Sequence, residues 1–316
     1  MKNTPKVALL SGLLILGLSI GSANAQTKKP VVKKAPAKTT AASGFKKLKG
    51  IKYKIVRDVP GKNAAIGDIV EFNIVAKVDT TVIADSRKQN AGKPAGTRVE
   101  EINGTGQWMA VLPFLSMGDS AIVEISCDTL LKTIPADKKD QLPPWMVKGK
   151  VIKVYLSIVS VKTMEQYTQE MQAKAALQGI EDDKTLQDYF TKNNIKPLKT
   201  ESGVYYTIQQ SGIGDKIANG DTVTMNYTGK TLDGNAFDSN VDSNFHHVQP
   251  FDFIPGTNSV IKGWEDAAVL LSKGTKATLY IPSPLAYGAQ SPSPAIPANS
   301  ILIFNIEVVN VKAGKK

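Results

Sequence analysis

The chain has 316 residues, of which 39 are Lys or Arg and 28 are Asp or Glu, so its formal net charge is +11. Residues 1–57 hold 13 of the basic residues and no acidic one, which leaves 26 basic (39 − 13) against 28 acidic residues in the remainder. The folded part is therefore nearly neutral, and a nucleic-acid-binding fold is not indicated. A single cysteine excludes an intramolecular disulfide, so stability must come from packing, which a chain of this length can supply in two domains.

Residues 1–25 are predicted to be a secretory signal peptide. Lys2 and Lys6 precede an apolar run over residues 7–20, and small residues lead up to Ala25, where we expect cleavage. A membrane anchor is the alternative, but the run is shorter than the ~20 apolar residues that a spanning helix needs. We expect no transmembrane segment in the mature chain.

Residues 26–44 are rich in Lys, Pro, Ala, Thr and Val, and they have too few large apolar side chains to fold. We predict a disordered tether. Its basic charge could touch an anionic envelope surface, but a solvated spacer without a specific partner is the favoured interpretation, and nucleic acid is not expected as a partner of an exported protein.

An internal repeat organises the rest of the chain. Residues 50–55 match residues 203–208, Gly67-Asp68 matches Gly220-Asp221, and residues 73–77 match residues 226–230, all at an offset of 153 (203 − 50). Further along, Trp108 pairs with Trp264 and residues 154–162 align with residues 304–312. The repeat predicts two domains of one fold, at residues 45–162 and 197–316.

Two further segments carry structural expectations. Cys127 ends an alternating apolar run, so we expect a buried strand residue and not a nucleophile. The linker, residues 163–196, is predicted to form two helices, the first up to Gly179 and the second capped by Asp182 or Asp183. Their apolar stripes should pack on one of the domains, while a role in dimerisation or substrate holding stays open.

The stretch from Val260 to Ala267 is the most informative of the C-terminal half. It predicts a short helix carrying Trp264, with an apolar run that ends at a glycine C-cap, Gly274. Strand patterns precede and follow it at residues 223–229, 236–239, 250–254, 277–281 and 301–309. A curved antiparallel sheet wrapped on this helix would place Trp264 at its centre.

The motifs YTG, FDS, PFDF, VIKGWE, LAYG and LIFNIEV occur in this order over about residues 200–312. Together they resemble the FKBP-type peptidyl-prolyl isomerases. The resemblance implies an α+β fold of two FKBP-like domains, each a curved antiparallel sheet wrapped on a short helix, joined by the helical linker. It also implies prolyl isomerase activity without any metal or cofactor.

The same resemblance implies the site. Trp264 would be the floor of an apolar pocket, and the catalytic polar groups would be Tyr227, Asp238 and Tyr287, with Tyr227 and Asp238 hydrogen-bonded to each other. The substrate-binding residues would be Phe237, Phe251, Val260, Ile261, Trp264, Ile296 and Phe304, with the Ile261 N–H as a donor. An ordinary aromatic core is the competing interpretation, but packing alone does not call for polar groups in such a cluster.

The sequence departs from the family pattern in two loops. The segment between Phe237 and Phe251 carries about four more residues than short family members, so we expect it to reach the pocket rim. His246 and His247 lie in it, but adjacent histidines point in different directions and no third ligand is evident, so no metal is expected. Pro292 stands where many relatives have His, and we expect it to tune substrate contact.

In the first domain the corresponding positions have lost the pocket residues. Ile74 stands at the position of Tyr227, and Ala84 and Val154 stand at those of two pocket phenylalanines. Only Trp108 and Asp85 remain. We expect Trp108 to be covered by neighbours such as Phe114 and Met109.

The sequence therefore predicts an exported prolyl isomerase that assists folding of exported proteins, with catalysis in the second domain. The periplasm is the expected location, with the cell surface or medium as alternatives. Expected partners are proline-containing unfolded or partly folded polypeptides, and rapamycin-like macrolides are expected inhibitors. A non-enzymatic chaperone or protein-binding module that uses both domains is the alternative.

Overall fold

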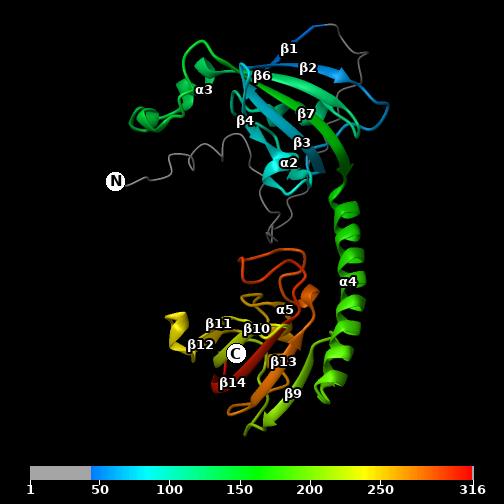
Figure 1. Ribbon diagram of the computed structural model, residues 1–316, viewed down its shortest axis with the longest axis vertical. Helices are drawn as coiled ribbons and strands as arrows, with labels where there is room; N and C mark the ends of the chain where they lie inside the picture. Colours follow the sequence, from blue (N-terminus) through cyan, green and yellow to red (C-terminus); the bar gives the residue numbers. More distant parts are fainter. Residues whose placement is uncertain (1–43, 315–316) are drawn as a thin grey trace. The chain divides into compact units, whose positions relative to one another are not determined.

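The computed structural model describes residues 44–314, which form two antiparallel sheets with few helices, so the predicted α+β class is confirmed (Figure 1). The chain divides into two compact units after Gln169. The signal peptide and almost all of the tether predicted above lie outside the described residues. None of the described helices is long and apolar enough to span a membrane.

The first unit contains one seven-stranded sheet with the order β1-β2-β6-β7-β3-β4, and β5 pairs with β3. Its strands are β1 Lys46–Leu48, β2 Ile51–Arg57, β3 Ile69–Val78, β4 Thr81–Asp85, β5 Ala95–Arg98, β6 Ser120–Ser126 and β7 Val151–Lys162. Its helices are α2 Ser86–Gln89, η1 Trp108–Phe114, α3 Cys127–Thr133 and η2 Ala136–Gln141.

The second unit repeats this arrangement with the order β11-β10-β14-β13-β9-β8, and β12 pairs with β10. Its strands are β8 Leu198–Lys199, β9 Tyr205–Gln210, β10 Thr222–Thr231, β11 Ala236–Ser239, β12 Phe251–Phe253, β13 Lys276–Ile281 and β14 Leu302–Lys312. Its short helices are η3 Ser243–Phe245, α5 Lys262–Ala268 and η4 Ser283–Leu285.

The two sheets agree in register as well as in strand order. Ile74 pairs with Leu156 and Tyr227 pairs with Ile306, positions that the repeat had equated. The bulge in β3 falls between Glu71 and Phe72, and the bulge in β10 falls at the position 153 residues later, between Thr224 and Met225 (71 + 153 = 224). A bulge fixes strand register and local bending, so the repeat extends to the detailed shape of each sheet.

The Gly-Asp pair of the repeat forms the turn before the long strand in both domains. Gly67 and Gly220 have left-handed backbones, with φ of 96° and 92°, which glycine adopts at little cost. The following carboxylates close the turns in the same way: Asp68 accepts a hydrogen bond from Ala65 N–H at 2.9 Å, and Asp221 accepts one from Ala218 N–H at 2.9 Å.

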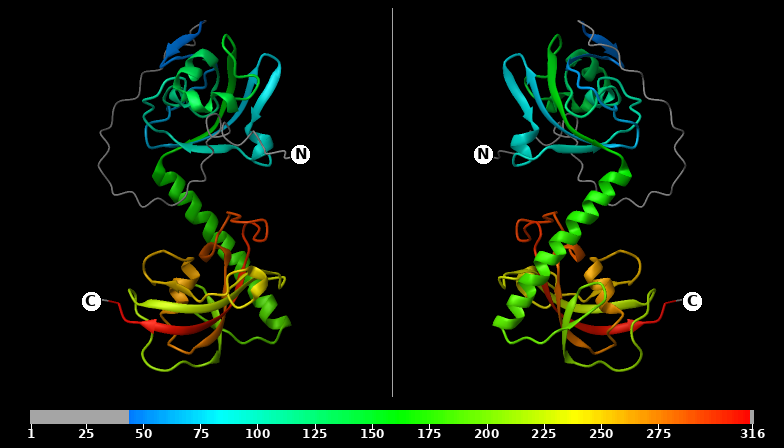
Figure 2. Two further views of the ribbon diagram at one scale, coloured as in Figure 1. Left: turned by 90° about the vertical axis from the view of Figure 1, so that its left-hand side faces the viewer. Right: turned by 90° about the vertical axis from the view of Figure 1, so that its right-hand side faces the viewer.

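The C-terminal sheet is covered on both faces. Along β14, Leu302, Phe304, Ile306 and Val308 face the core that contains α5, whereas Ile303 faces the opposite side. This alternation is the ordinary strand period of two. The opposite side, with Tyr205, Tyr280, Ile301 and Ile303, packs against Leu186 and Phe190 of the helix α4, Met164–Lys192. Figure 2 shows that helix lying against this sheet in both views.

The prediction of two linker helices is wrong, because α4 is one helix of 29 residues. Gly179 does not end it, and Asp182 is not a cap. Instead the buried Asp182 carboxylate accepts hydrogen bonds from the Ser283 N–H at 2.6 Å and from the Gln178 side chain at 2.8 Å. The partner that makes a mid-helix aspartate tolerable lies 101 residues away in the sequence.

Two smaller expectations are also corrected. Cys127 is buried, as predicted, but it begins α3 instead of ending a strand, because the Ser126 side chain caps the helix by accepting from Asp128 N–H. The helix α5 ends at Ala268, well before the expected glycine cap at Gly274. As expected, Trp108 is buried at the start of a 3₁₀ helix, in a core against which Met109 and Phe114 pack, and its ring lies 5.0 Å from that of Phe72 between centroids.

Candidate active site

Trp264 is held in place by the close packing of α5 on the sheet. The helix begins after Ile261, which is its N-cap residue. A Cβ atom at Gly263 would lie 2.5 Å from Cγ2 of Ile281 on β13, so only glycine allows this approach. The indole that follows is 5% exposed and forms the floor of the site.

Aromatic rings from three strands surround this indole. Tyr227 on β10, Phe304 on β14 and Phe251 and Phe253 on β12 have ring centroids 5.3, 5.2, 6.2 and 5.6 Å from that of Trp264. Most of these contacts are edge-to-face, the arrangement that the ring quadrupole favours. Phe237 on β11 adds a ring 5.7 Å from Phe304.

The rest of the apolar wall comes from the residues just before α5 and from the loop before β14. Val260 and Ile261 are half-buried against the same core, and Ile296 is 5% exposed. Phe251 and Tyr287 are 40% and 38% exposed, so they form the rim. The cluster is therefore closed beneath and open on one side.

Polar groups converge on one edge of the cluster. The Tyr227 hydroxyl donates to Oδ2 of Asp238 at 2.6 Å, as the family resemblance implies. Burial, then the hydrogen bond to Asp238, raises the pKa of Tyr227 well above its usual range. Burial, then the nearby Asp238 charge, also raises the pKa of Tyr287. Both hydroxyls thus keep their protons at neutral pH and can serve as donors.

Three hydrogen-bond donors at the site lack a partner within residues 44–314. They are the buried Nε1 of Trp264, the backbone N–H of Ile261 and the hydroxyl of Tyr287. A buried donor without a partner typically costs ~1–3 kcal/mol. The arrangement is suited to a ligand that brings carbonyl oxygens into an apolar cavity.

Gly229 provides the room for two of the rings. A Cβ atom at this position would lie 2.6 Å from Phe237 and 2.7 Å from Phe304. Its counterpart in the first sheet is Ala76, which is fully buried and pairs with Ala84 and Val154. In that domain small side chains fill the space that the rings occupy in the other.

The first domain also lacks the polar edge. Ile74 has no hydroxyl, and the Asp85 carboxylate accepts instead from the N–H of Arg87 at 3.1 Å, capping α2. Trp108 is covered by the core around Phe72. The aspartate that the first domain shares with the second therefore caps a helix there and does not belong to a pocket edge.

Two residues of the site were missed by sequence reasoning. Phe253 follows Phe251 at strand spacing and stacks on it at 6.3 Å, so the alternation in PFDF could have indicated it. His247 lies with Nε2 2.6 Å from Oδ1 of Asp238. The longer loop between Phe237 and Phe251 was the only signal for that contact.

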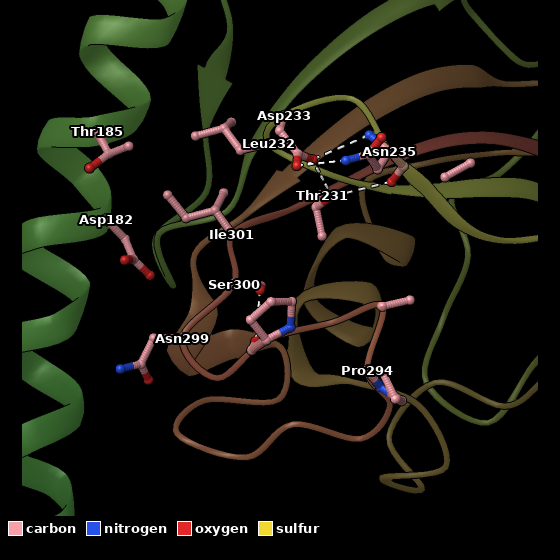
Figure 3. Close-up of a pocket in the computed structure, with 13 residues that line it drawn as sticks. Asp182, Thr185, Thr231, Leu232, Asp233, Asn235, Pro294, Asn299, Ser300 and Ile301 are labelled. Atoms are coloured by element: carbon pink, nitrogen blue, oxygen red, sulfur yellow. Dashed lines mark hydrogen bonds between the residues drawn. The ribbon is translucent and has the colours of Figure 1, made fainter.

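A separate hollow of about 610 Å³ lies between α4, the β10–β11 turn and residues 294–301 (Figure 3). Its lining mixes polar side chains with apolar ones such as Leu232, Pro294 and Ile301. The Thr231 hydroxyl donates to Asp233, and Asp233 also accepts from the Asn235 side chain at 2.7 Å. Because these groups satisfy one another and no aromatic ring lines the hollow, it does not fit the chemistry of the aromatic site.

The chain matches known proteins over part of its length. Residues 214–309 match the family model FKBP-type peptidyl-prolyl cis-trans isomerase. A probable FKBP-type isomerase of Haemophilus influenzae is 35% identical over 52% of this chain and 65% of its own length. The FKBP-type isomerase FkpA of Aeromonas hydrophila is 34% identical over 48% of this chain and 56% of its own length. The chain thus spans less than two thirds of these bacterial relatives. FK506-binding protein 1A of Aspergillus fumigatus is 43% identical over 34% of this chain and 95% of its own length.

Proposed function

The chain belongs to the FKBP-type peptidyl-prolyl cis-trans isomerases, and on that premise we propose that its second domain isomerises prolyl bonds in unfolded or partly folded polypeptides. The observation that carries the proposal is the aromatic cluster around Trp264 with the Tyr227–Asp238 hydrogen bond at its edge. The predicted signal peptide in residues 1–25 supports action on exported proteins, in the periplasm above all.

The reaction needs no nucleophile. Rotation about the prolyl amide is slow because it breaks amide resonance, with a barrier of ~18–20 kcal/mol. A twisted amide is less polar than a planar one, so an apolar site that excludes water favours it. The indole of Trp264 would support the proline ring, with Phe237 and Phe304 at its sides and Phe251 at the rim.

Hydrogen bonds would then select the twisted geometry. The Ile261 N–H is placed at the start of α5 to donate to a substrate carbonyl, and the Tyr287 hydroxyl lies at the open rim to donate to a second one. Asp238, held by its hydrogen bond from Tyr227, would place a negative charge at a fixed position beside these two donors. Preorganised donors of this kind stabilise a transition state without reorganising during the reaction.

A refolding assay tests the proposal. The full chain should accelerate the proline-limited refolding phase of a substrate protein, which takes tens to hundreds of seconds without catalysis. The relative from Aspergillus fumigatus is named for binding FK506, and we propose that FK506 and rapamycin-like macrolides occupy this pocket. An unaltered refolding rate, or macrolide binding that leaves the rate unchanged, would contradict the assignment.

A binding role for the first domain is the second candidate. The outer face of β7 exposes Val151, Tyr155 and Val159, four residues apart and 37%, 41% and 40% exposed, with the charged Lys153 between the first two. These exposed apolar side chains could hold an unfolded client while the second domain acts on it. Suppression of client aggregation by a chain with a disabled second pocket would support this role.

A further inference from the structure

The loop between β11 and β12 has a defined conformation at the edge of the aromatic site. Its first residue, Asn240, is 3% exposed and ties both ends of the loop to β10: it accepts from Tyr227 N–H at 2.7 Å and donates to the carbonyls of Met225 and Gln249 at 2.9 and 3.1 Å. Asp242 caps η3, and His246 ends it with a left-handed backbone, φ 60°. The next residue, His247, reaches back to the site.

The contact of His247 completes the coordination of Asp238. Nε2 of His247 lies 2.6 Å from Oδ1 of Asp238, while Oδ2 accepts from the Tyr227 hydroxyl at 2.6 Å. An ionised carboxylate only accepts hydrogen bonds, so Nε2 carries a proton whether the imidazole is neutral or charged. Both carboxylate oxygens are thus held from opposite sides, and Tyr227 transmits this constraint to Trp264 through the ring contact at 5.3 Å.

We propose that His247 is a positioning and specificity-determining residue of the isomerase site, an inference that rests on the proposed function. It fixes the Asp238 carboxylate, and its own charge decides whether this edge of the pocket is anionic or neutral. With a neutral imidazole the pair carries one negative charge, which disfavours substrates with an acidic residue beside the proline. With a charged imidazole the pair is neutral and that discrimination is lost.

His247 is the imidazole that contacts this edge of the pocket. Tyr227 on β10 and Tyr287 after η4 both have a raised pKa and stay neutral. In the loop itself, Asp242 is used as the cap of η3, and on α5 Lys262 and Asp266 form an ion pair with each other. Asp252 lies between Phe251 and Phe253 on β12 and is exposed. Histidine is the side chain that ordinarily titrates between pH 5 and 8.

Because both side chains are exposed, loss of the contact between His247 and Asp238 should change the activity and not the stability of the protein. The side chains of His247 and Asp238 are 49% and 38% exposed, and exposed pairs contribute little to folding. The neighbouring His246 is a matched control, because its side chain, unlike that of His247, has no hydrogen-bond or ion-pair partner within the described part of the chain.

The test compares substrates and variants in the full-length chain. Tetrapeptides with Glu or Gln immediately before proline are assayed at pH 8 and pH 5.5, where the substrate Glu is still ionised. In the wild type, the preference for Gln over Glu in kcat/KM should fall roughly threefold at the lower pH, as expected for one charge about 7–8 Å away at the surface. His246→Gln should behave as the wild type.

Two variants separate charge from position. His247→Gln keeps a donor beside Asp238 but cannot titrate, so its preference for Gln should stay high at both pH values while its activity at pH 8 stays within about twofold of the wild type. His247→Ala frees the carboxylate, and kcat/KM should fall roughly fivefold for both substrates, as for the loss of one hydrogen bond. Thermal unfolding should be unchanged in all variants.

The outcomes distinguish the two proposals. If the wild type catalyses neither peptide, the proposed function fails and the role of His247 fails with it. If the wild type is active but His247→Gln retains the pH-dependent preference, or His246→Gln loses it, the proposed function stands and the assignment to His247 is wrong. Were His247→Ala to unfold, the Gln variant would still decide the question.

Discussion

Gly229 and Ala76 pair with equivalent positions of the last strand, Phe304 and Val154, in two sheets of the same topology, yet one lies beneath two phenylalanine rings and the other beneath Ala84 and Val154. In the second domain the glycine leaves room for large rings at the neighbouring positions. In the first domain the alanine takes up that room, and the neighbouring side chains are small. The difference shows that a pocket can vanish by redistributing side-chain volume over an unchanged strand framework.

The outer faces of the two sheets differ in the same coordinated way. Tyr205, Tyr280 and Ile303 lie beneath α4 in the second domain. By register, Lys52, Glu124 and Lys153 take these places in the first, where Lys153 and Glu124 form an ion pair at 3.6 Å. The face that a helix covers is aromatic and apolar, and the face without that cover is charged. The second half of α4 therefore belongs to the second domain, and a fragment that starts at residue 196 would uncover this face.

The largest expected effect tests that assignment of α4. Phe190→Ala removes a ring that packs 5.1 Å from Tyr205 and 5.0 Å from Tyr280, and loss of a buried aromatic typically costs ~3–5 kcal/mol. Denaturant unfolding followed at Trp264 should show it. Leu177→Ala, at a site on the same helix that is 66% exposed, should change stability by less than ~0.5 kcal/mol. Equal effects of the two would mean that α4 is only a connector.

The exchange of volume is tested by Gly229→Ala. Its Cβ atom must displace Phe237 and Phe304, so the pocket should be distorted at a folding cost of ~1–3 kcal/mol. We expect isomerase activity to fall on the order of 100-fold, or ~2.7 kcal/mol in the barrier. Ala76→Gly should leave activity intact and cost roughly 0.5–1 kcal/mol of stability. Appreciable turnover in Gly229→Ala that survives further loss of Trp264 would reveal a second site in the first domain.

A smaller effect is expected from Tyr287→Phe, which has no counterpart in the first domain. It removes one donor at the rim, and a single hydrogen bond is worth ~1 kcal/mol, so kcat/KM should fall about fivefold with little change in stability. Tyr155→Phe on the first domain should have no effect. Complete loss of activity in folded Tyr287→Phe would show that the hydroxyl, and not the shape of the pocket, dominates catalysis.

The smallest effect concerns alkaline pH. Burial raises the pKa of Tyr280, Tyr227 and Tyr287 in the second domain but only that of Tyr53 in the first. A raised folded pKa gives stability that is full below the unfolded value near pH 10 and is lost as pH rises through the folded one. The second domain should therefore weaken more steeply above pH 10. Thermal unfolding should be measured at pH 8 and 10.5. Tyr280→Phe should reduce the loss of stability between these pH values, and an unchanged loss would contradict the contribution of Tyr280.

Local pattern and repeat were sufficient to predict the strands and the Gly-Asp turns, because strand alternation and fixed offsets constrain them directly. The residues gathered around Trp264 were implied by the resemblance to the FKBP family. Pattern and repeat were insufficient where a contact with another residue determines the local structure. The sequence around Asp182 is typical of a helix cap, but in the structure its carboxylate accepts from the Ser283 N–H within a continuous helix. Likewise, Cys127 lies in a helix because the Ser126 side chain caps it. The contact between His247 and Asp238 depends on the left-handed backbone at His246, which no sequence pattern specifies.

The place of the final strand in each sheet has a consequence for biosynthesis. β7 lies between β6 and β3, and β14 lies between β13 and β10, so the last strand of each domain to leave the ribosome occupies the middle of its sheet. Until it arrives, two long strand edges have no partner, and unpaired edges invite aggregation. Neither domain can close progressively as it is synthesised; each must wait for its whole sequence and then form its most distant pairings last. Ribosome-nascent-chain complexes should therefore show protease resistance of the first domain only once residues up to Lys162 are exposed.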